Sequence, residues 1–129
     1  MRLLLDTHII LAIFEKQTEK FPFGVRRLLA DTTAEFHASV ASLWEIAIKY
    51  RLGKLDLTPA LETLPELLGV IGIELAPITA PHVLTAAYPE PMTRDPFDRL
   101  LLAQCQAEDF RLVTIDRALI GHRLAAQAT

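Results

Sequence analysis

Short apolar runs alternate with longer stretches of helical periodicity in this chain, and this alternation restricts its fold more than any other feature. An apolar run over residues 3–5 stops at Asp6, and apolar residues then recur at helical spacing up to Phe14. Similar runs predict further strands over 35–38, 70–78 and 111–115. Strands that alternate with helices form a parallel sheet covered by helices on both faces. The sequence therefore predicts an α/β fold.

Apolar stripes and helix start and stop signals predict the helices between these strands. One stripe begins at Val40 and ends before Gly53, and a strongly apolar helix is expected from Pro96 through Glu108. The other helices are predicted over 25–30, from Thr58 and Pro59 through Leu68, over 81–88, and from Arg117 to a frayed tail at 125–129.

Length and charge limit the organisation of the chain and the partners it can bind. A chain of 129 residues with 51% hydrophobic content is the size of one domain with a real core, so we expect a single domain over residues 1–129. Lys and Arg total 13 against 16 Asp and Glu, which gives a net charge of −3. This balance excludes a uniformly basic surface that coats nucleic acid.

Cysteine and histidine usage argues against a disulfide framework and against zinc. Cys105 is the single cysteine, and no Cys-x-x-Cys or His-Glu-x-x-His spacing occurs. This usage fits a reducing, cytoplasmic setting. Asp6 and His8 interrupt the apolar N-terminus, and no segment has the ~18 uninterrupted apolar residues of a membrane-spanning helix. We therefore expect neither a signal peptide nor a membrane span.

Two aspartates directly follow predicted strands. Asp6 ends the first apolar run, and Asp116 ends the run over 111–115. Ligands of open parallel sheets bind beyond the carboxyl ends of the strands, so both carboxylates are candidate site residues. The alternative is that each caps the helix predicted after it, because Asp is a favoured N-cap residue.

Three further acids lie near the starts of predicted helices. Glu45 either forms a capping box with Ser42 or, if Ser39 caps the helix, is free for another role. Asp95 precedes a proline and is expected to be an N-cap. A second carboxylate at Asp98 adds repulsion unless a cation or a basic side chain lies between the two.

The parallel sheet could bring together Asp6, Glu45, Asp98 and Asp116, a set called the acidic cluster from here on. Like charges in one cleft raise each other's pKa values unless divalent cations neutralise them. Ligands that are all oxygen select Mg²⁺ or Mn²⁺ over Zn²⁺. Such ions can orient a phosphodiester and activate an attacking water.

Four motifs in order carry a resemblance to a known family over essentially the whole chain. They are Leu-Leu-Leu-Asp-Thr-His, Ser-Leu-Trp-Glu-Ile-Ala-Ile-Lys with Gly-Lys-Leu, Arg-Asp-Pro-Phe-Asp-Arg-Leu-Leu-Leu-Ala-Gln, and Leu-Val-Thr-Ile-Asp. Together they resemble PIN-domain proteins, most closely the VapC-type toxins of type II toxin–antitoxin pairs. The resemblance implies a three-layer α/β/α sandwich and a Mg²⁺- or Mn²⁺-dependent ribonuclease. The acidic positions of that family map onto Asp6, Glu45, Asp98 and Asp116, with Asp95 as a possible auxiliary ligand.

The resemblance also suggests residues that support the acids. The hydroxyl positions of the family are Thr7 and Thr114 here, and we expect them to hydrogen-bond the carboxylates. Relatives with the Arg-Asp-Pro-Phe-Asp motif often carry His where this chain has Thr93, so one basic group near the scissile phosphate is missing. Arg94 and Arg99 flank the acids in sequence, which favours them for phosphate contact.

The leading hypothesis is therefore an endoribonuclease in which a water attacks the phosphorus and leaves 3′-hydroxyl and 5′-phosphate ends. The family resemblance further implies a cognate antitoxin and a homodimer. The competing hypothesis is a non-catalytic module that keeps the fold and binds RNA or a protein. Four mutually repelling carboxylates argue against that module.

Overall fold

The computed structural model of this chain describes residues 1–127, and within them four strands form one parallel sheet in the order β3-β2-β1-β4. Leu5 on β1 pairs with Ala38 on β2 and with Val113 on β4, so the carboxyl ends of these strands lie side by side. The predicted parallel sheet is thus confirmed. The strands are β1 (Arg2–Leu5), β2 (Glu35–Ser39), β3 (Ile73–Ala76) and β4 (Arg111–Val113).

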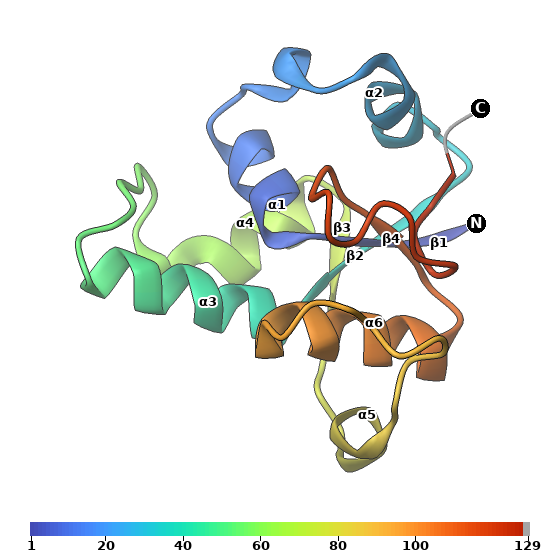
Figure 1. Cartoon of the computed structure of the whole chain (residues 1–129). Helices are drawn as coiled ribbons and strands as arrows, with labels where there is room; N and C mark the ends of the chain where they lie inside the picture. The colour runs from blue at the N-terminus through green and yellow to red at the C-terminus, as the bar shows by residue number, and fades with distance from the viewer. Residues whose placement is uncertain (128–129) are drawn as a thin grey trace.

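Helices cover both faces of the sheet, as Figure 1 shows with α1 and α2 on one side and α5 and α6 on the other. None of the helices within residues 1–127 combines the length and apolarity needed to cross a membrane. The α-helices are α1 (Thr7–Phe14), α2 (Phe23–Leu29), α3 (Val40–Arg51), α4 (Leu64–Val70), α5 (Ala80–Leu84) and α6 (Pro96–Glu108), and the short 3₁₀ helices are η1 (Thr18–Lys20) and η2 (Leu61–Thr63).

Two apolar clusters fill the space between the sheet and its helices. Successive side chains of a strand point to opposite faces, so Leu3 and Leu5 of β1 belong to one cluster and Leu4 to the other. The first cluster includes residues of α1, α2, α3 and α4, and the second includes residues of α6. This arrangement confirms the three-layer α/β/α architecture.

The helix predicted from Thr58 through Leu68 begins later than expected. Residues 58–60 are not helical, η2 follows, and α4 starts only at Leu64. Pro65 occupies the first turn of α4, where its missing N–H costs no hydrogen bond. The expected start at Thr58 and Pro59 was therefore wrong. A helix from there would have carried Pro65 in its interior.

The prediction of a final helix from Arg117 was also wrong, because residues 117–121 form turns. The following segment returns to the sheet beside β4. The Leu112 N–H donates to the Leu124 carbonyl and the Ala126 N–H donates to the Leu112 carbonyl, both at 2.8 Å. Ala125 is buried and Ala126 bonds to β4, so the expected fraying of the tail is wrong at residues 125 and 126, and residues 128 and 129 lie outside the described part.

Candidate active site

Asp6 lies at the carboxyl end of β1 and is only 3% exposed. One carboxylate oxygen accepts the backbone N–H of Thr7 at 2.8 Å, and the other accepts the hydroxyl of Thr114 at 2.7 Å. Burial raises the pKa of Asp6, and the charge of Glu45 adds to the rise. His8 and the two hydrogen bonds oppose it. The expected hydroxyl bond from Thr114 to a carboxylate is therefore present, but the one expected from Thr7 is wrong, because the Thr7 hydroxyl donates to Ser42. Asp6 also caps α1.

Asp116 comes from the adjacent strand, just beyond the end of β4. Its backbone N–H donates to the Thr114 hydroxyl oxygen at 3.0 Å, and its carboxylate accepts the N–H of Ala118 at 2.9 Å. The Thr114 hydroxyl thus bonds to the side chain of Asp6 and to the backbone of Asp116 at once. Asp116 caps a turn, because no helix follows it.

Which residue caps the N-terminus of α3 decides whether Glu45 takes part in helix capping. Ser39 is the N-cap and accepts the N–H of Ala41 at 3.0 Å, so the capping box with Ser42 does not form. Ser42 instead accepts a hydrogen bond from the Thr7 hydroxyl at 2.9 Å, which ties α3 to α1. Glu45 is free of helix capping.

Asp95 has the N-cap role that the sequence predicted. Its carboxylate accepts the N–H groups of Phe97 and Asp98 at 2.8 and 3.4 Å. The side chain is on the exposed surface at the start of α6. One capping carboxylate satisfies the first turn of α6, which leaves the carboxylate of Asp98 available.

Asp98 lies half-buried in the first turn of α6. Burial raises the pKa of Asp98 to about 7, and repulsion from Asp95, Asp6 and Asp116 adds to this effect. A hydrogen bond from the Thr93 hydroxyl at 3.2 Å opposes the rise. The acids at 6, 98 and 116 therefore act on one another electrostatically although they are far apart in sequence.

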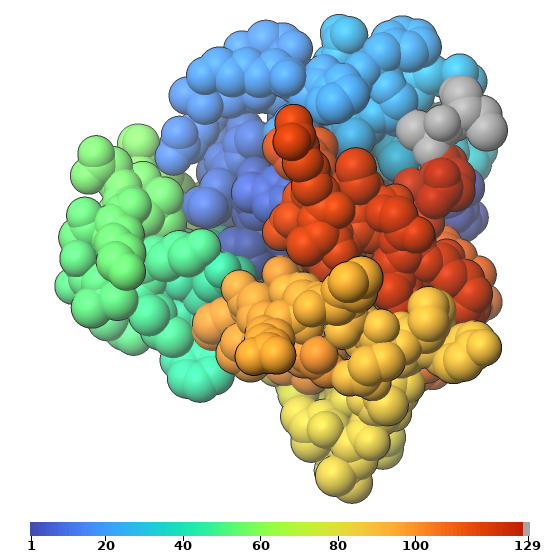
Figure 2. Space-filling view, in the orientation of Figure 1, coloured from blue at the N-terminus to red at the C-terminus, as the bar shows by residue number. Residues whose placement is uncertain are grey.

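Packing between helices brings together the segments that carry the acidic cluster. Helix α3 packs against both α1 and α6. Trp44 and Phe97, the neighbours of Glu45 and Asp98 in sequence, meet edge to face at 5.6 Å between ring centroids. Figure 2 shows dark-blue residues of the N-terminal segment between teal α3, orange α6 and the red C-terminal segment. The structure thus gathers the four segments that carry the predicted acids.

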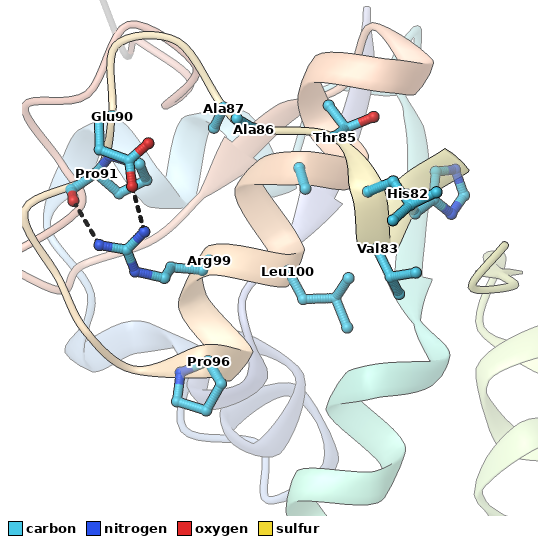
Figure 3. A pocket seen from close by; sticks show the side chains of 12 residues that line it. His82, Val83, Thr85, Ala86, Ala87, Glu90, Pro91, Pro96, Arg99 and Leu100 are labelled. Atoms are coloured by element: carbon cyan, nitrogen blue, oxygen red, sulfur yellow. Dashed lines mark hydrogen bonds and ion pairs between the residues drawn. The ribbon is translucent and has the colours of Figure 1, made fainter. Parts of the chain in front are cut away.

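Arg99 binds the loop over residues 89–94, the proline loop. Its guanidinium pairs with Glu90 and donates to the carbonyls of Pro91 at 3.1 Å and Thr93 at 2.8 Å (Figure 3). It also lines a cavity of about 450 Å³ between α5 and α6, whose lining contains no member of the acidic cluster. Arg94 is exposed beside Asp95, where a phosphate can reach it.

Sequence reasoning gave no role to Lys49 and considered Ser42 only as a cap. Lys49 pairs with Glu45 at 2.8 Å, and the i, i+4 spacing of the two residues on a helix was the signal for it. The bond between Ser42 and Thr7 crosses two helices, so no local pattern reveals it. The ring of His8 accepts the N–H of Ile115 at 3.2 Å, which ties α1 to the segment after β4.

The donor set fits a hard divalent cation. All four candidate ligands are carboxylates, and hard cations such as Mg²⁺ and Mn²⁺ prefer oxygen ligands. A cation between them would relieve the repulsion that raises the pKa of Asp98. Across residues 1–127 no group of three or more His, Cys, Asp or Glu side chains is already arranged to hold an ion. One oxygen of Glu45 already pairs with Lys49, so a cation would have to share this carboxylate or displace the ammonium.

Most of this chain matches a known protein family. The family model of the PIN domain matches residues 3–122, which includes all four acids. No curated protein matched the chain. PIN domains are typically nucleases that act on RNA or other nucleic acids, and they generally use divalent metals. By this match over most of its length, the chain belongs to the PIN domain family.

Proposed function

We propose that this protein is a Mg²⁺- or Mn²⁺-dependent endoribonuclease whose cation is held by Asp6, Glu45, Asp98 and Asp116. One observation carries the proposal. The four acids lie on separate segments that come together at the carboxyl edge of the sheet, and repulsion from Asp6 and Asp116 adds to the effect of burial in raising the pKa of Asp98. Such an arrangement costs folding free energy unless it serves a cation. Membership of the PIN family supports the same conclusion.

The chain's own residues have distinct tasks in the proposed reaction. A divalent cation, when bound, polarises the phosphodiester and lowers the pKa of the attacking water. Thr114 and the backbone of Thr7 fix the carboxylate of Asp6, so this ligand is already oriented. Arg94 contacts the substrate phosphate. The water oxygen bonds to phosphorus as the bond to the 3′ oxygen breaks, which leaves a 3′-hydroxyl and a 5′-phosphate.

We extend the proposal to the biological setting that the sequence motifs suggest. The protein would be the toxin of a type II toxin–antitoxin pair, acting in the cytoplasm as a homodimer and inhibited by a cognate antitoxin. The support is the family membership together with the four VapC-like motifs. An antitoxin gene directly upstream, and growth arrest that its product relieves, are the expected observations.

Cleavage of RNA by the purified protein tests the nuclease. We expect cleavage with Mg²⁺ or Mn²⁺ and none with EDTA. Asp6→Asn should lower the rate at least ~100-fold, because it removes one charged ligand of the cation. Asp56→Asn is the matched control, since Asp56 is exposed and outside the acidic cluster. Thermal unfolding of each variant checks that it is folded.

Two results would contradict the proposal. Full activity of Asp6→Asn, or cleavage that EDTA does not affect, would remove the acidic cluster from the reaction. Calorimetric titration with Mn²⁺ gives an independent measure. Absence of both heat and any shift in melting temperature would favour a non-catalytic module that binds RNA or protein on the same fold.

A further inference from the structure

Lys49 and Glu45, a member of the acidic cluster, lie on α3 and form an ion pair. The ammonium group of Lys49 lies 2.8 Å from a carboxylate oxygen of Glu45, one helical turn earlier. The Glu45 side chain is 14% exposed and that of Lys49 is 48% exposed. The pair therefore joins a largely buried carboxylate to a cation that water can reach.

Two further acids act on the same ammonium group. The hydrogen bond to Glu45 is the main cause of the raised pKa of Lys49, and the charges of Asp95 and Asp6 add to it. Of the other nearby basic groups, Arg99 is bound by the proline loop, and His8 lies 3.6 Å from Asp6. Lys49 thus supplies positive charge inside the region where the acids repel one another.

A divalent cation and an ammonium group compete for the same carboxylate. An ion held by the whole acidic cluster must take Glu45 as a ligand, and Oε2 of Glu45 already faces an ammonium at 2.8 Å, so the ion has to displace that ammonium or share the carboxylate with it. The positive charge of Lys49 also repels an incoming cation. Both effects weaken binding of the cation, and both disappear when the charge of Lys49 is removed.

We propose that Lys49 is a positioning residue that competes with the divalent cation for Glu45 and so sets the metal affinity of the acidic cluster. The inference rests on the metal site of the proposed function. Under this proposal the acidic cluster binds its cation only when the free cation concentration is high enough to displace Lys49 from Glu45. The same ammonium offsets the charge of Glu45 while no cation is bound.

Mn²⁺ titration of the EDTA-treated protein, followed by calorimetry, tests this competition. Lys49→Gln should bind Mn²⁺ about five- to tenfold more tightly than the unchanged protein, since one ion pair no longer has to break. Lys49→Met should do the same. Lys49→Arg keeps the charge and should bind no more tightly than the unchanged protein. Lys54→Gln, an exposed change just beyond the same helix, should leave the affinity unaltered.

A second readout separates competition from a purely structural role. Without added cation, Lys49→Gln should melt at a lower temperature than the unchanged protein, while saturating Mn²⁺ should raise its melting temperature by a larger step. A lysine that only stabilises α3 would lower the melting temperature and leave the affinity for Mn²⁺ unchanged.

If Lys49→Gln and Lys49→Met bind Mn²⁺ no more tightly than the unchanged protein, the proposed competition is wrong, even if RNA is cleaved normally. Tighter Mn²⁺ binding by these variants, with no RNA cleavage by the unchanged protein, would support the proposed competition and contradict the proposed nuclease activity. If none of the proteins binds Mn²⁺, the competition is wrong together with the metal site.

Discussion

Thr114 is the residue that joins two acids of the cluster most directly. Its hydroxyl donates to the buried carboxylate of Asp6 at 2.7 Å and accepts the backbone N–H of Asp116 at 3.0 Å. One oxygen atom therefore fixes the ends of β1 and β4 relative to each other. Because Thr114 is itself buried, water cannot readily replace either bond.

Replacing this hydroxyl tests how strongly the site depends on it. Thr114→Val keeps the shape of the side chain and leaves Asp6 without one donor, so we expect a loss of about 1–3 kcal/mol in the free energy of unfolding. Binding of Mn²⁺ should also weaken, because Asp6 is no longer oriented. Urea unfolding and calorimetry measure the two effects, with exposed Thr58→Val as the control. Equal stability and affinity of both variants would contradict this role.

For single residues, the sequence predicted where a side chain lies in the fold better than which groups it bonds to. Asp6 and Asp116 could be placed near each other because adjacent parallel strands end at one edge. The partners of Arg99 could not be predicted, since the rotamers of a long side chain depend on the loop against which it packs. The two Arg candidates for phosphate contact thus differ: Arg99 is held by the proline loop, and Arg94 is exposed.

At the scale of elements, the start of α6 carries a capping acid and a cluster acid three residues apart. Asp95 bonds to the first N–H groups of the helix, while Asp98 is half-buried and accepts from Thr93. Asn caps helices about as well as Asp does, so a substitution can remove the charge of Asp95 and keep its capping role.

We therefore expect Asp95→Asn to retain stability and RNA cleavage within a few-fold of the unchanged protein. Asp95→Ala should lose about 1 kcal/mol of unfolding free energy, because the N–H groups lose their acceptor. Thermal unfolding and the cleavage assay measure the two quantities. If Asp95→Asn loses activity as completely as Asp6→Asn, Asp95 is a ligand of the cation as well as a cap.

Elements were predictable where several local signals agree. Helix α6 has the predicted bounds, Pro96 to Glu108, because a cap, a proline in the first turn and a long apolar stripe coincide. Thr58 and Pro59 give a similar start signal, but Pro65 follows within two turns and cannot occupy a helix interior. The helix therefore starts at Leu64, because the backbone restriction at Pro65 outweighs the start signal at Thr58 and Pro59.

At the scale of the whole molecule, the segment after β4 closes the edge of the sheet. Its bonds to Leu112 cover the N–H and carbonyl groups that an edge strand would expose. Arg117 onward looked helical from its apolar spacing, yet Leu119 and Leu124 instead enter the core beside α6. Tertiary burial decided the conformation, and local periodicity cannot report such contacts.

Leu124→Ala tests whether this segment is part of the folded core. Leu124 is 1% exposed, so the cavity left behind should lower the free energy of unfolding by about 2–4 kcal/mol. Ile120→Ala is the matched control in the same segment, because Ile120 is 48% exposed. Its effect should stay below about 1 kcal/mol in urea unfolding. Similar losses for both variants would mean that the segment does not pack as described.

The order of the acids along the chain has a consequence for protein synthesis. Asp6, Glu45 and Asp98 leave the ribosome before Asp116, and β4 must pair with β1 before Thr114 can join the two strand ends. A nascent chain that ends before residue 116 lacks one of the four proposed ligands. The proposed set of ligands would therefore be complete only after Asp116 has left the ribosome and β4 has paired with β1.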